Sequence, residues 1–274
     1  MNEIRLIAFD LDGTFLRDDK SIPEENMKAL EYAASKGVEI VPATGRLYKG
    51  IPPEIMALPF IRYYILINGS KIYDSKEDRV VSRAEIPVED ALAFYDYADT
   101  VPCIYDCYVN DTGRMSRSMY DVMDRYFPDH NYLKLMKKLR EPVDDLKETV
   151  RREGVPLQKM QLFFADLDER TRQYVSMPER FPDLIFSTSL ASNIEINYKT
   201  AGKGKAIRRL CAELGIPPES SLAFGDGLND MEMIEMAGTG AVMSNGDEEL
   251  LRIADIVVGN NNDAGVAKAI YEMI

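Results

Sequence analysis

The N-terminal part of the sequence has the pattern of a strand, a helix and a second strand, and this order restricts the fold more than any other feature. Residues 6–9 and 38–41 are short apolar runs of branched and aromatic side chains, which is typical of buried strands. Between them, residues 22–36 carry apolar side chains at helical spacing, with Pro23 at a first helical position and Gly37 as the stop. Such a unit connects parallel strands, so we expect a parallel sheet.

The C-terminal part of the sequence repeats this alternation of helices and strands. The expected helices are at 205–214 and 231–237, and the expected strands are at 221–224, 240–243 and 256–258. Because both ends of the chain show the same pattern, we expect them to build one sheet together.

The middle of the sequence loses the regular alternation and contains Tyr-rich and charged segments. A chain of 274 residues is also longer than one average domain. We therefore predict an α/β protein with a Rossmann-like parallel-sheet core, formed by residues 1–82 and 198–274. An α+β domain is expected as an insertion at residues 83–197. A third apolar run, at 64–67, is expected to add another buried strand to the core.

Two Asp-Leu-Asp sequences follow apolar runs, and their surroundings differ. Asp10 and Asp12 would share one face at the carboxyl end of the first strand, because alternate residues of a strand point the same way. Open parallel sheets place ligands at that end, and Gly13 permits a sharp turn there. Two such carboxylates suit a hard cation such as Mg2+. The pair Asp166 and Asp168 instead opens an acidic helix start, so we interpret it as an N-cap.

Three further polar clusters are expected at the same edge of the sheet. The sequence GDGLND supplies Asp226, Asn229 and Asp230, ATGR supplies Thr44, Gly45 and Arg46, and KTAGKGKAI brings Lys203 or Lys205 to a helix start. Each cluster alone could be a turn, a helix cap or a solvated loop. Four clusters at one edge indicate a polar site. The Lys-Gly repeat is not a P-loop, because Asn197 stands where the first glycine is needed.

Composition excludes several classes of function. The formal net charge is -13, and nucleic-acid binding normally needs a basic surface, so no DNA or RNA partner is expected. No apolar stretch reaches membrane-spanning length and no signal-peptide pattern is present, so we expect a cytoplasmic location and no membrane partner. Cys103 and Cys107 have the spacing of half a zinc site, but His130 is the only histidine and a second ligand pair is missing.

The motifs, in this order, resemble those of the haloacid dehalogenase (HAD) superfamily. DLDGT resembles its first motif, ATGR its second, the lysine of AGKGKAI its third and GDGLND its fourth. NGS at 68–70 and the segments VMSNGDEEL and NNDAGVAKAI are similar to Cof-type phosphatases, which carry a large C2-type cap between the second and third motifs. MSNGDEEL departs from the Met-Gly-Asn-Ala run of many relatives, which leaves the contact expected near Asn245 open.

The resemblance implies a role for each motif residue. Asp10 would be the nucleophile that forms an aspartyl phosphate, and Asp12 would protonate the leaving alcohol and later deprotonate the attacking water. Mg2+ would be held by the Asp10 carboxylate, the Asp12 backbone carbonyl and Asp226. Lys203 is preferred to Lys205 as the third-motif lysine. The substrate and its phosphate would contact Thr44, the Gly45 N–H, Lys203, Arg46, Asn68 and Asn229, with Asp230 in support.

The leading hypothesis is a Mg2+-dependent phosphatase of a small phosphorylated metabolite, with the inserted domain as a lid. Sugar phosphates are the commonest implication of the resemblance, and a phosphorylated riboflavin precursor, FMN and pyridoxal phosphate are others. A phosphomutase and a metabolite-binding module without turnover are the alternatives. The sequence does not indicate the oligomeric state. Plausible specificity residues in the inserted domain are Arg114, Arg117, Tyr120 and Lys134.

Overall fold

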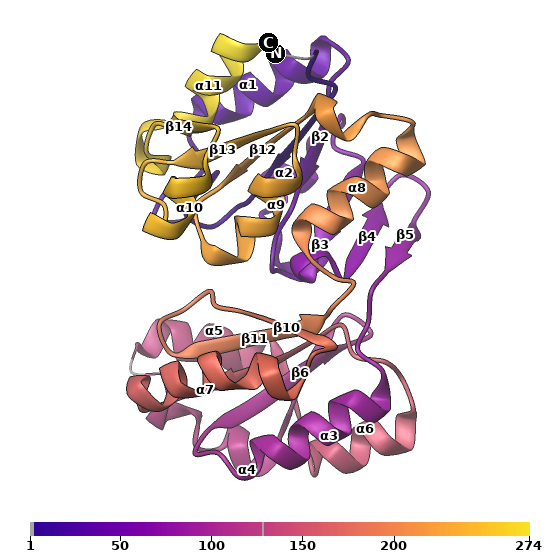
Figure 1. Ribbon diagram of the computed structural model, residues 1–274, viewed down its shortest axis with the longest axis vertical. Coiled ribbons are helices and arrows are strands. Elements are labelled where there is room, and N and C mark those ends of the chain that lie inside the picture. Colours follow the sequence, from indigo (N-terminus) through magenta and orange to yellow (C-terminus); the bar gives the residue numbers. More distant parts are fainter. Residues whose placement is uncertain (1–2, 128) are drawn as a thin grey trace. The chain divides into compact units, whose positions relative to one another are not determined.

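The computed structural model describes residues 3–127 and 129–274 and divides into two compact units (Figure 1). The first unit, called the core, spans Met1–Arg83 and Thr200–Ile274. The second, called the inserted unit, spans Ala84–Lys199. No strand pairing joins the two units among the described residues, and each unit has its own buried apolar residues, so each is described separately.

The core is built on a five-stranded sheet with the order β14-β13-β12-β1-β2. All four neighbouring pairs are parallel, which confirms the prediction from the strand–helix–strand pattern. The first strand, β1, lies between β12 and β2, and all four of its residues are buried. The strands are β1 (Leu6–Phe9), β2 (Glu39–Pro42), β12 (Ser221–Gly225), β13 (Thr239–Met243) and β14 (Ile256–Val258).

Helices cover the core sheet. On one face, Leu6 and Ala8 of β1 join an apolar cluster with side chains of α8, α9 and α10. Figure 1 shows α1 beside α11, against which it packs. The helices are α1 (Glu24–Ser35), α2 (Pro53–Met56), α8 (Lys203–Leu214), α9 (Met231–Met236), α10 (Glu248–Ile253) and α11 (Gly265–Met273). The 3-10 turns are η1 (Tyr48–Gly50), η2 (Ile67–Gly69), η4 (Pro218–Ser220), η5 (Leu228–Asp230) and η6 (Asn261–Asp263).

One predicted detail of the core is corrected, and one expected strand is confirmed. Pro23 is the residue before α1 and not its first helical residue. The buried strand expected at 64–67 is present, shifted by one residue, as β3 (Tyr63–Leu66). It pairs antiparallel with β4 (Lys71–Asp74), which in turn pairs antiparallel with β5 (Arg79–Arg83). Asn68 and the glycine after it have positive φ angles and reverse the chain between β3 and β4. An isolated parallel bridge between Ala43 and Ile65 connects β3 with the parallel sheet.

The inserted unit is an α+β fold on a six-stranded sheet, with the order β10-β11-β9-β6-β7-β8. Its neighbouring strands are antiparallel except for β7 and β8, which are parallel. The strands are β6 (Ile104–Val109), β7 (Thr112–Ser116), β8 (Arg140–Val143), β9 (Lys159–Phe163), β10 (Leu184–Ser187) and β11 (Asn193–Tyr198). The helices are α3 (Val88–Ala98), α4 (Arg117–Tyr120), α5 (His130–Lys138), α6 (Leu146–Glu153) and α7 (Leu167–Arg180), with the turn η3 (Met123–Arg125).

The start of α7 confirms the interpretation of the second Asp-Leu-Asp sequence. The Asp166 side chain accepts hydrogen bonds from the backbone N–H groups of Asp168, at 2.9 Å, and Glu169, at 3.2 Å. These are N-cap hydrogen bonds, and the acidic first turn compensates the positive end of the helix dipole. This carboxylate pair therefore has a structural role.

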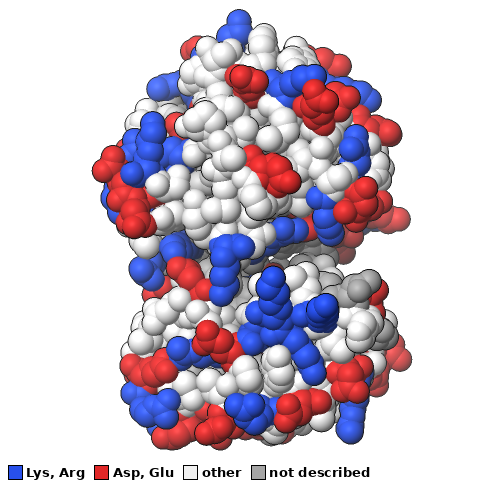
Figure 2. Space-filling view, turned by 180° about the vertical axis from the view of Figure 1, so that it is seen from behind, with Lys and Arg blue, Asp and Glu red and all other residues white. Residues whose placement is uncertain are grey.

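The molecular surface mixes charges of both signs. Figure 2 shows Lys and Arg side chains interspersed with Asp and Glu side chains on the face seen there, although the formal net charge is -13. Within residues 3–127 and 129–274, no helix has the length and apolar composition that a membrane-spanning helix requires.

Candidate functional site

Four loops of the core meet at the carboxyl edge of the parallel sheet. Asp10 directly follows β1, Thr44 lies two residues after β2, and Asp226 directly follows β12. The first residue of α8, Lys203, reaches this edge with its side chain and contacts Asp10. Parallel strands end at the same edge, so residues far apart in the sequence become neighbours here.

A buried lysine lies between two buried aspartates at the centre of this edge. Lys203 Nζ is 2.5 Å from Asp10 Oδ1 and 2.6 Å from Asp230 Oδ1. The Lys203 residue is only 1% exposed, so its ammonium group depends on these carboxylates for charge compensation. Burial alone would lower the pKa of Lys203, but the attraction of Asp10 and Asp230 outweighs it and raises the pKa. The lysine therefore stays charged.

The same ion pair affects the nucleophile candidate, Asp10. Burial raises the pKa of the Asp10 carboxyl group, the Lys203 ammonium opposes that shift, and the carboxylates of Asp230 and Asp226 reinforce it. An additional cation would act in the same direction as Lys203 and favour the ionised carboxylate. The electrostatics of the site therefore favour cation binding.

Asp226 is held by the loop that follows β1. Its Oδ1 accepts a 2.6 Å hydrogen bond from the Thr14 hydroxyl group. Gly13 has a φ angle of 82°, and a Cβ atom there would lie 2.2 Å from Asp226 Oδ2, so a side chain at this position would displace the carboxylate. Burial, followed by the charge of Asp230, raises the pKa of Asp226 to about 7. Asp226 is therefore, like Asp10, a carboxylate whose negative charge is not fully offset by neighbouring positive groups.

A divalent cation fits this donor set. Within the described residues, carboxylate oxygens of Asp10, Asp226 and Asp230 lie within 4.8 Å of one another. Lys203 contacts the Oδ1 atoms of Asp10 and Asp230, so Asp226 and the other oxygen of Asp10 are the better placed ligands. A hard cation that binds a few carboxylates and keeps several waters, such as Mg2+, matches a site of this kind.

Asp12 is oriented by two basic side chains. Arg46 binds it with two hydrogen bonds, Nε to Oδ2 at 2.8 Å and Nη2 to Oδ1 at 2.7 Å, and donates from Nη1 to the Gly50 carbonyl. Lys20 Nζ is 2.9 Å from Asp12 Oδ1. Burial acts to raise the pKa of Asp12, but the hydrogen bond and charge of Arg46, together with Lys20, outweigh it and lower the pKa. Arg46 therefore lies against Asp12, a contact that the sequence did not indicate.

Hydrogen bonds connect the loop after β2 with the loop after β3, next to the site. Thr44 is buried, its hydroxyl oxygen accepts from the Arg46 N–H at 3.2 Å, and its carbonyl accepts from the Asn68 N–H at 3.0 Å. The Asn68 carbonyl in turn accepts from the Gly202 N–H at 2.9 Å, next to Lys203. A Cβ atom at Gly45 would lie 2.9 Å from Asn68 Oδ1, so glycine lets these two loops approach closely.

The loop after β12 is ordered by Asp230. Besides Lys203, its carboxylate accepts the backbone N–H groups of Asp226, at 3.0 Å, and Gly227, at 3.1 Å. Asn229 is half-buried with its Oδ1 near Gly227, and within the described part of the chain its side chain makes no hydrogen bond. From this loop, Asp230 contacts Lys203.

Two asparagines near the C-terminus fasten the loop that follows β1. Asn245 Nδ2 donates to the Gly13 carbonyl at 2.8 Å, and Asn245 Oδ1 accepts from the Asn261 N–H at 3.0 Å. Asn261 Nδ2 donates to the Leu16 carbonyl at 2.9 Å. The contact at Asn245 that the sequence left open is therefore present. The role of Asn261 was not predicted, although NNDAGVAKAI was noted as a motif.

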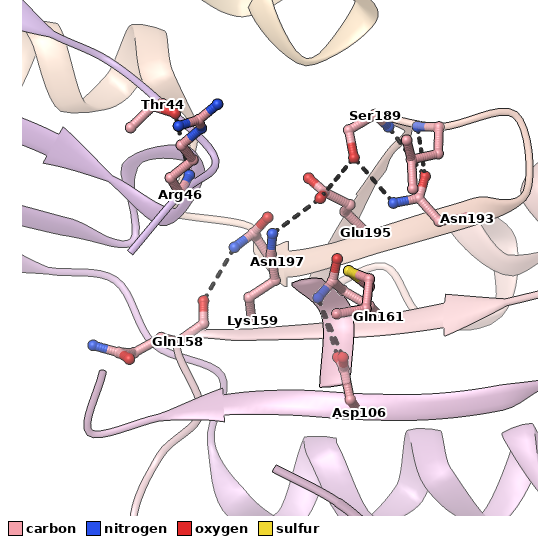
Figure 3. A network of polar contacts seen from close by, with 12 residues as sticks. Thr44, Arg46, Asp106, Gln158, Lys159, Gln161, Ser189, Asn193, Glu195 and Asn197 are labelled. Carbon is pink, nitrogen blue, oxygen red and sulfur yellow. Dashed lines mark hydrogen bonds and ion pairs between the residues drawn. The ribbon is translucent and has the colours of Figure 1, made fainter. Parts of the chain in front are cut away.

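The inserted unit has a polar face that the sequence analysis did not identify. Asp106, Gln161 and Glu195 lie opposite one another on β6, β9 and β11, and all three are buried. Figure 3 shows this face: Gln161 donates to Asp106, and Lys159 pairs with Glu195 at 2.9 Å. Buried charges are tolerated because they are paired.

Of the four residues proposed from sequence as specificity contacts, three have partners within the inserted unit and one is exposed. Arg114 forms an ion pair with Glu153, Arg117 lies 3.9 Å from Asp144, Tyr120 donates to the Lys137 carbonyl, and Lys134 is exposed. Arg114 and Tyr120 therefore have structural partners within the inserted unit, and their role in specificity stays a prediction.

Comparison with known proteins identifies the family. The family model for haloacid dehalogenase-like hydrolases matches residues 7–270. Phosphatase YwpJ of Bacillus subtilis (strain 168) is 29% identical over 99% of this chain and 100% of its own length. The 5-amino-6-(5-phospho-D-ribitylamino)uracil phosphatase YcsE of the same organism is 30% identical over 99% of this chain and 96% of its own. A solved haloacid dehalogenase-like hydrolase from B. subtilis has a TM-score of 0.82 at 28% identity, covering 99% and 100%.

The chain therefore belongs to the haloacid dehalogenase-like hydrolase family, and the resemblance found in the motifs is confirmed. It is an enzyme of the phosphatase branch, a phosphoric monoester hydrolase. The α/β fold class with an inserted α+β unit is likewise confirmed.

Proposed function

We propose that this enzyme is a Mg2+-dependent phosphatase that hydrolyses a small phosphorylated metabolite through an aspartyl phosphate on Asp10. The observation that carries the proposal is the Asp10 carboxylate, which lies 2.5 Å from the charged Lys203 and within 4.8 Å of Asp226. An anionic nucleophile can approach an anionic phosphate only where positive charge offsets the repulsion. Lys203 supplies part of that charge.

In the first step, an Asp10 oxygen attacks phosphorus and the bond from phosphorus to the leaving alcohol oxygen breaks. Asp12 donates a proton to that oxygen, so the alcohol leaves neutral. The phosphoryl oxygens are held by Lys203, the Thr44 hydroxyl group and the Gly45 N–H. These groups stabilise the charge that the phosphoryl group carries in the transition state.

In the second step, water attacks phosphorus and the bond to Asp10 breaks, which regenerates the carboxylate. Asp12, now ionised, accepts the proton of the water. Arg46 and Lys20, which hold the Asp12 carboxylate, favour its ionised form and thus this step. Asp230 holds Lys203 in place through both steps.

Mg2+ would be held by the carboxylates of Asp10 and Asp226 and by the backbone carbonyl of Asp12, and would neutralise charge on the phosphate and its nucleophile. Asn68 and Asn229 complete the proposed substrate pocket. The boundaries predicted from the sequence, a hydrolase core at 1–82 and 198–274 and a cap at 83–197, stay proposals and lie within two residues of the boundaries between the two compact units. A cytoplasmic location and the absence of a nucleic-acid partner stay predictions.

The proposed substrate class is a phosphate monoester of a sugar or a similar polar alcohol. The name of one relative assigns it a phosphorylated ribitylaminouracil, and the name of another, from Escherichia coli (strain K12) and 28% identical, assigns it pyridoxal phosphate. Both are small molecules with polar leaving groups, which supports a metabolite rather than a polymer as substrate.

The experiment that tests the proposal is phosphate release from a panel of sugar phosphates, nucleotides, FMN and pyridoxal phosphate. Each substrate is measured with Mg2+ and with EDTA, for the wild-type enzyme and for Asp10→Asn. We expect release that needs Mg2+ and falls by at least about 10³-fold in the variant, because the nucleophile is lost. Release that is unaffected by EDTA, or that survives in Asp10→Asn, would refute the mechanism. Conversion of a sugar phosphate to its isomer would identify a phosphomutase.

A further inference from the structure

The helix that carries Lys203 begins without a capping side chain of its own. Gly202 precedes α8 with a φ angle of 122° and offers no side chain, and the first turn contains no acidic residue. The first backbone N–H groups of a helix lack partners within the helix, and negative charge stabilises that end. A side-chain acceptor for the first turn of α8 can therefore come only from outside its N-cap and first turn.

Glu232 of α9 supplies this acceptor. Its Oε2 accepts the Lys205 backbone N–H at 3.2 Å, in the first turn of α8. Its Oε1 lies 2.5 Å from Lys205 Nζ, which holds the carboxylate in this orientation. Glu232 thus caps α8 from a neighbouring helix. The second lysine of the GKGK sequence, Lys205, forms the ion pair that orients this carboxylate.

The two glycines on either side of Lys203 make this approach possible. A Cβ atom at Gly202 would lie 1.9 Å from Glu232 Oε2, and one at Gly204 would lie 2.2 Å from the Glu232 carbonyl oxygen. A side chain at Gly202 would displace the Glu232 carboxylate, and one at Gly204 fits only if α9 moves away. The sequence Gly-Lys-Gly therefore allows Glu232 and its backbone to pack directly against the start of α8.

The segment that carries Glu232 also binds the other end of the lysine. Asp230, two residues earlier, accepts from Lys203 Nζ at 2.6 Å. One short stretch of chain therefore holds Lys203 twice, at its ammonium group through Asp230 and at its helical turn through Glu232. Because Lys203 is only 1% exposed, a shift of that turn would move the ammonium group relative to Asp10.

We propose that Glu232 is a positioning residue that sets the location of the Lys203 ammonium group between Asp10 and Asp230. The inference depends on the proposed function for its kinetic readout, because Lys203 then acts in phosphoryl transfer. Glu232 itself touches neither substrate nor metal in this proposal. Its effect passes through the first turn of α8.

The kinetic test compares Glu232→Ala, Glu232→Gln and Glu235→Ala on the best substrate of the panel. Glu232→Ala should lower kcat/KM by about 10- to 100-fold, since misplacing a catalytic group by about 1 Å costs on this order. Glu232→Gln keeps an oxygen acceptor for the Lys205 N–H and should recover part of the loss. Glu235, exposed on the same helix, is the control, and Glu235→Ala should match the wild type.

A purely structural role makes a different prediction. It would lower the melting temperature of Glu232→Ala but leave kcat/KM unchanged at temperatures where the variant is folded. That result, or an equal loss of kcat/KM in Glu235→Ala, would overturn the inference. If Glu232→Ala does not fold, Glu232→Met takes its place, because methionine keeps the length of the side chain but offers no oxygen acceptor to the Lys205 N–H, and a kcat/KM equal to wild type in that variant would overturn the inference.

Crystal structures of the wild type and the folded Glu232 variant separate this inference from the proposed function. If the wild type releases no phosphate, the proposed function fails, and the structures alone decide the positioning role. A Lys203 Nζ displaced from Asp10 in the variant would support it. An unmoved Lys203 would refute it, whatever the activity of the enzyme.

Discussion

At the scale of single residues, the contact between Arg46 and Asp12 leads to a prediction about the leaving group. Arg46→Ala removes the two hydrogen bonds that orient the Asp12 carboxylate. Loss of Arg46 also removes an interaction that lowers the pKa of Asp12, which favours its protonated form. For alkyl phosphates we expect the loss of orientation to outweigh this gain, so kcat/KM should fall by about 10- to 100-fold, because their alcohols need a well-placed proton donor. For p-nitrophenyl phosphate, whose leaving group departs without a proton, the loss should be several-fold smaller.

The measurement is kcat/KM for both kinds of ester, because this ratio reports on the steps up to release of the alcohol. Lys49→Ala is the control, since Lys49 is an exposed cation close in sequence to Arg46 and outside the site. Added guanidinium should restore part of the activity of Arg46→Ala. Equal losses for alkyl and aryl esters would show that Arg46 acts on the phosphate rather than through Asp12.

The same contact shows where prediction from sequence stops. The positions of Asp10, Asp226 and Lys203 at one sheet edge followed from motifs that each come after a strand or start a helix. The contact of Arg46 with Asp12 could not be predicted from these motifs, because Asp12 lies 34 residues away and the direction of a long side chain depends on tertiary packing. Glu232 was missed for the same reason, since its partner is a backbone N–H group of another helix.

At the scale of elements, the cap of α7 can be tested without affecting the site. Asp166→Ala removes the side chain that accepts two N-cap hydrogen bonds, so the free energy of unfolding should fall by about 1 kcal/mol. Asp168→Ala is the matched control, because the cap hydrogen bonds of α7 are accepted by Asp166 and not by the Asp168 side chain. This control should lower the free energy of unfolding by only about 0.3 kcal/mol, through the lost interaction with the helix dipole. Urea denaturation measures both. A larger loss in Asp168→Ala would contradict the assignment of the cap.

The elements themselves were largely predictable, and the errors have physical causes. Parallel strands of the core are continuous apolar runs, so the buried strands β1 and β12 and the more exposed edge strand β14 were found within one residue. The start of α8 was placed two residues late, because Gly-Lys-Gly has the composition of a loop and its cap comes from α9. The antiparallel partner of β3 was missed, since NGS at 68–70 was interpreted as a family motif rather than as a reversal of the chain.

At the scale of the whole molecule, the acidic cluster should make stability depend on both pH and Mg2+. Burial, followed by the charge of Asp230, raises the pKa of Asp226 to about 7, and burial raises the pKa of Asp10. A carboxyl group with a higher pKa in the folded state binds more protons there than in the unfolded chain. The free energy of unfolding of the metal-free protein should therefore fall as the pH rises from about 4 to about 7.

Mg2+ binds the ionised carboxylates, so it should stabilise the protein more at about pH 7.5 than at about pH 5. The measurement is urea denaturation at both pH values, with EDTA and with excess Mg2+. Burial also raises the pKa of Glu39 and of Asp106, but neither belongs to the cluster, so the difference between the two conditions isolates the site. Asp226→Asn should remove most of that difference. An equal effect of Mg2+ at both pH values would show that the cation binds elsewhere, because protonation of this cluster would then not compete with it.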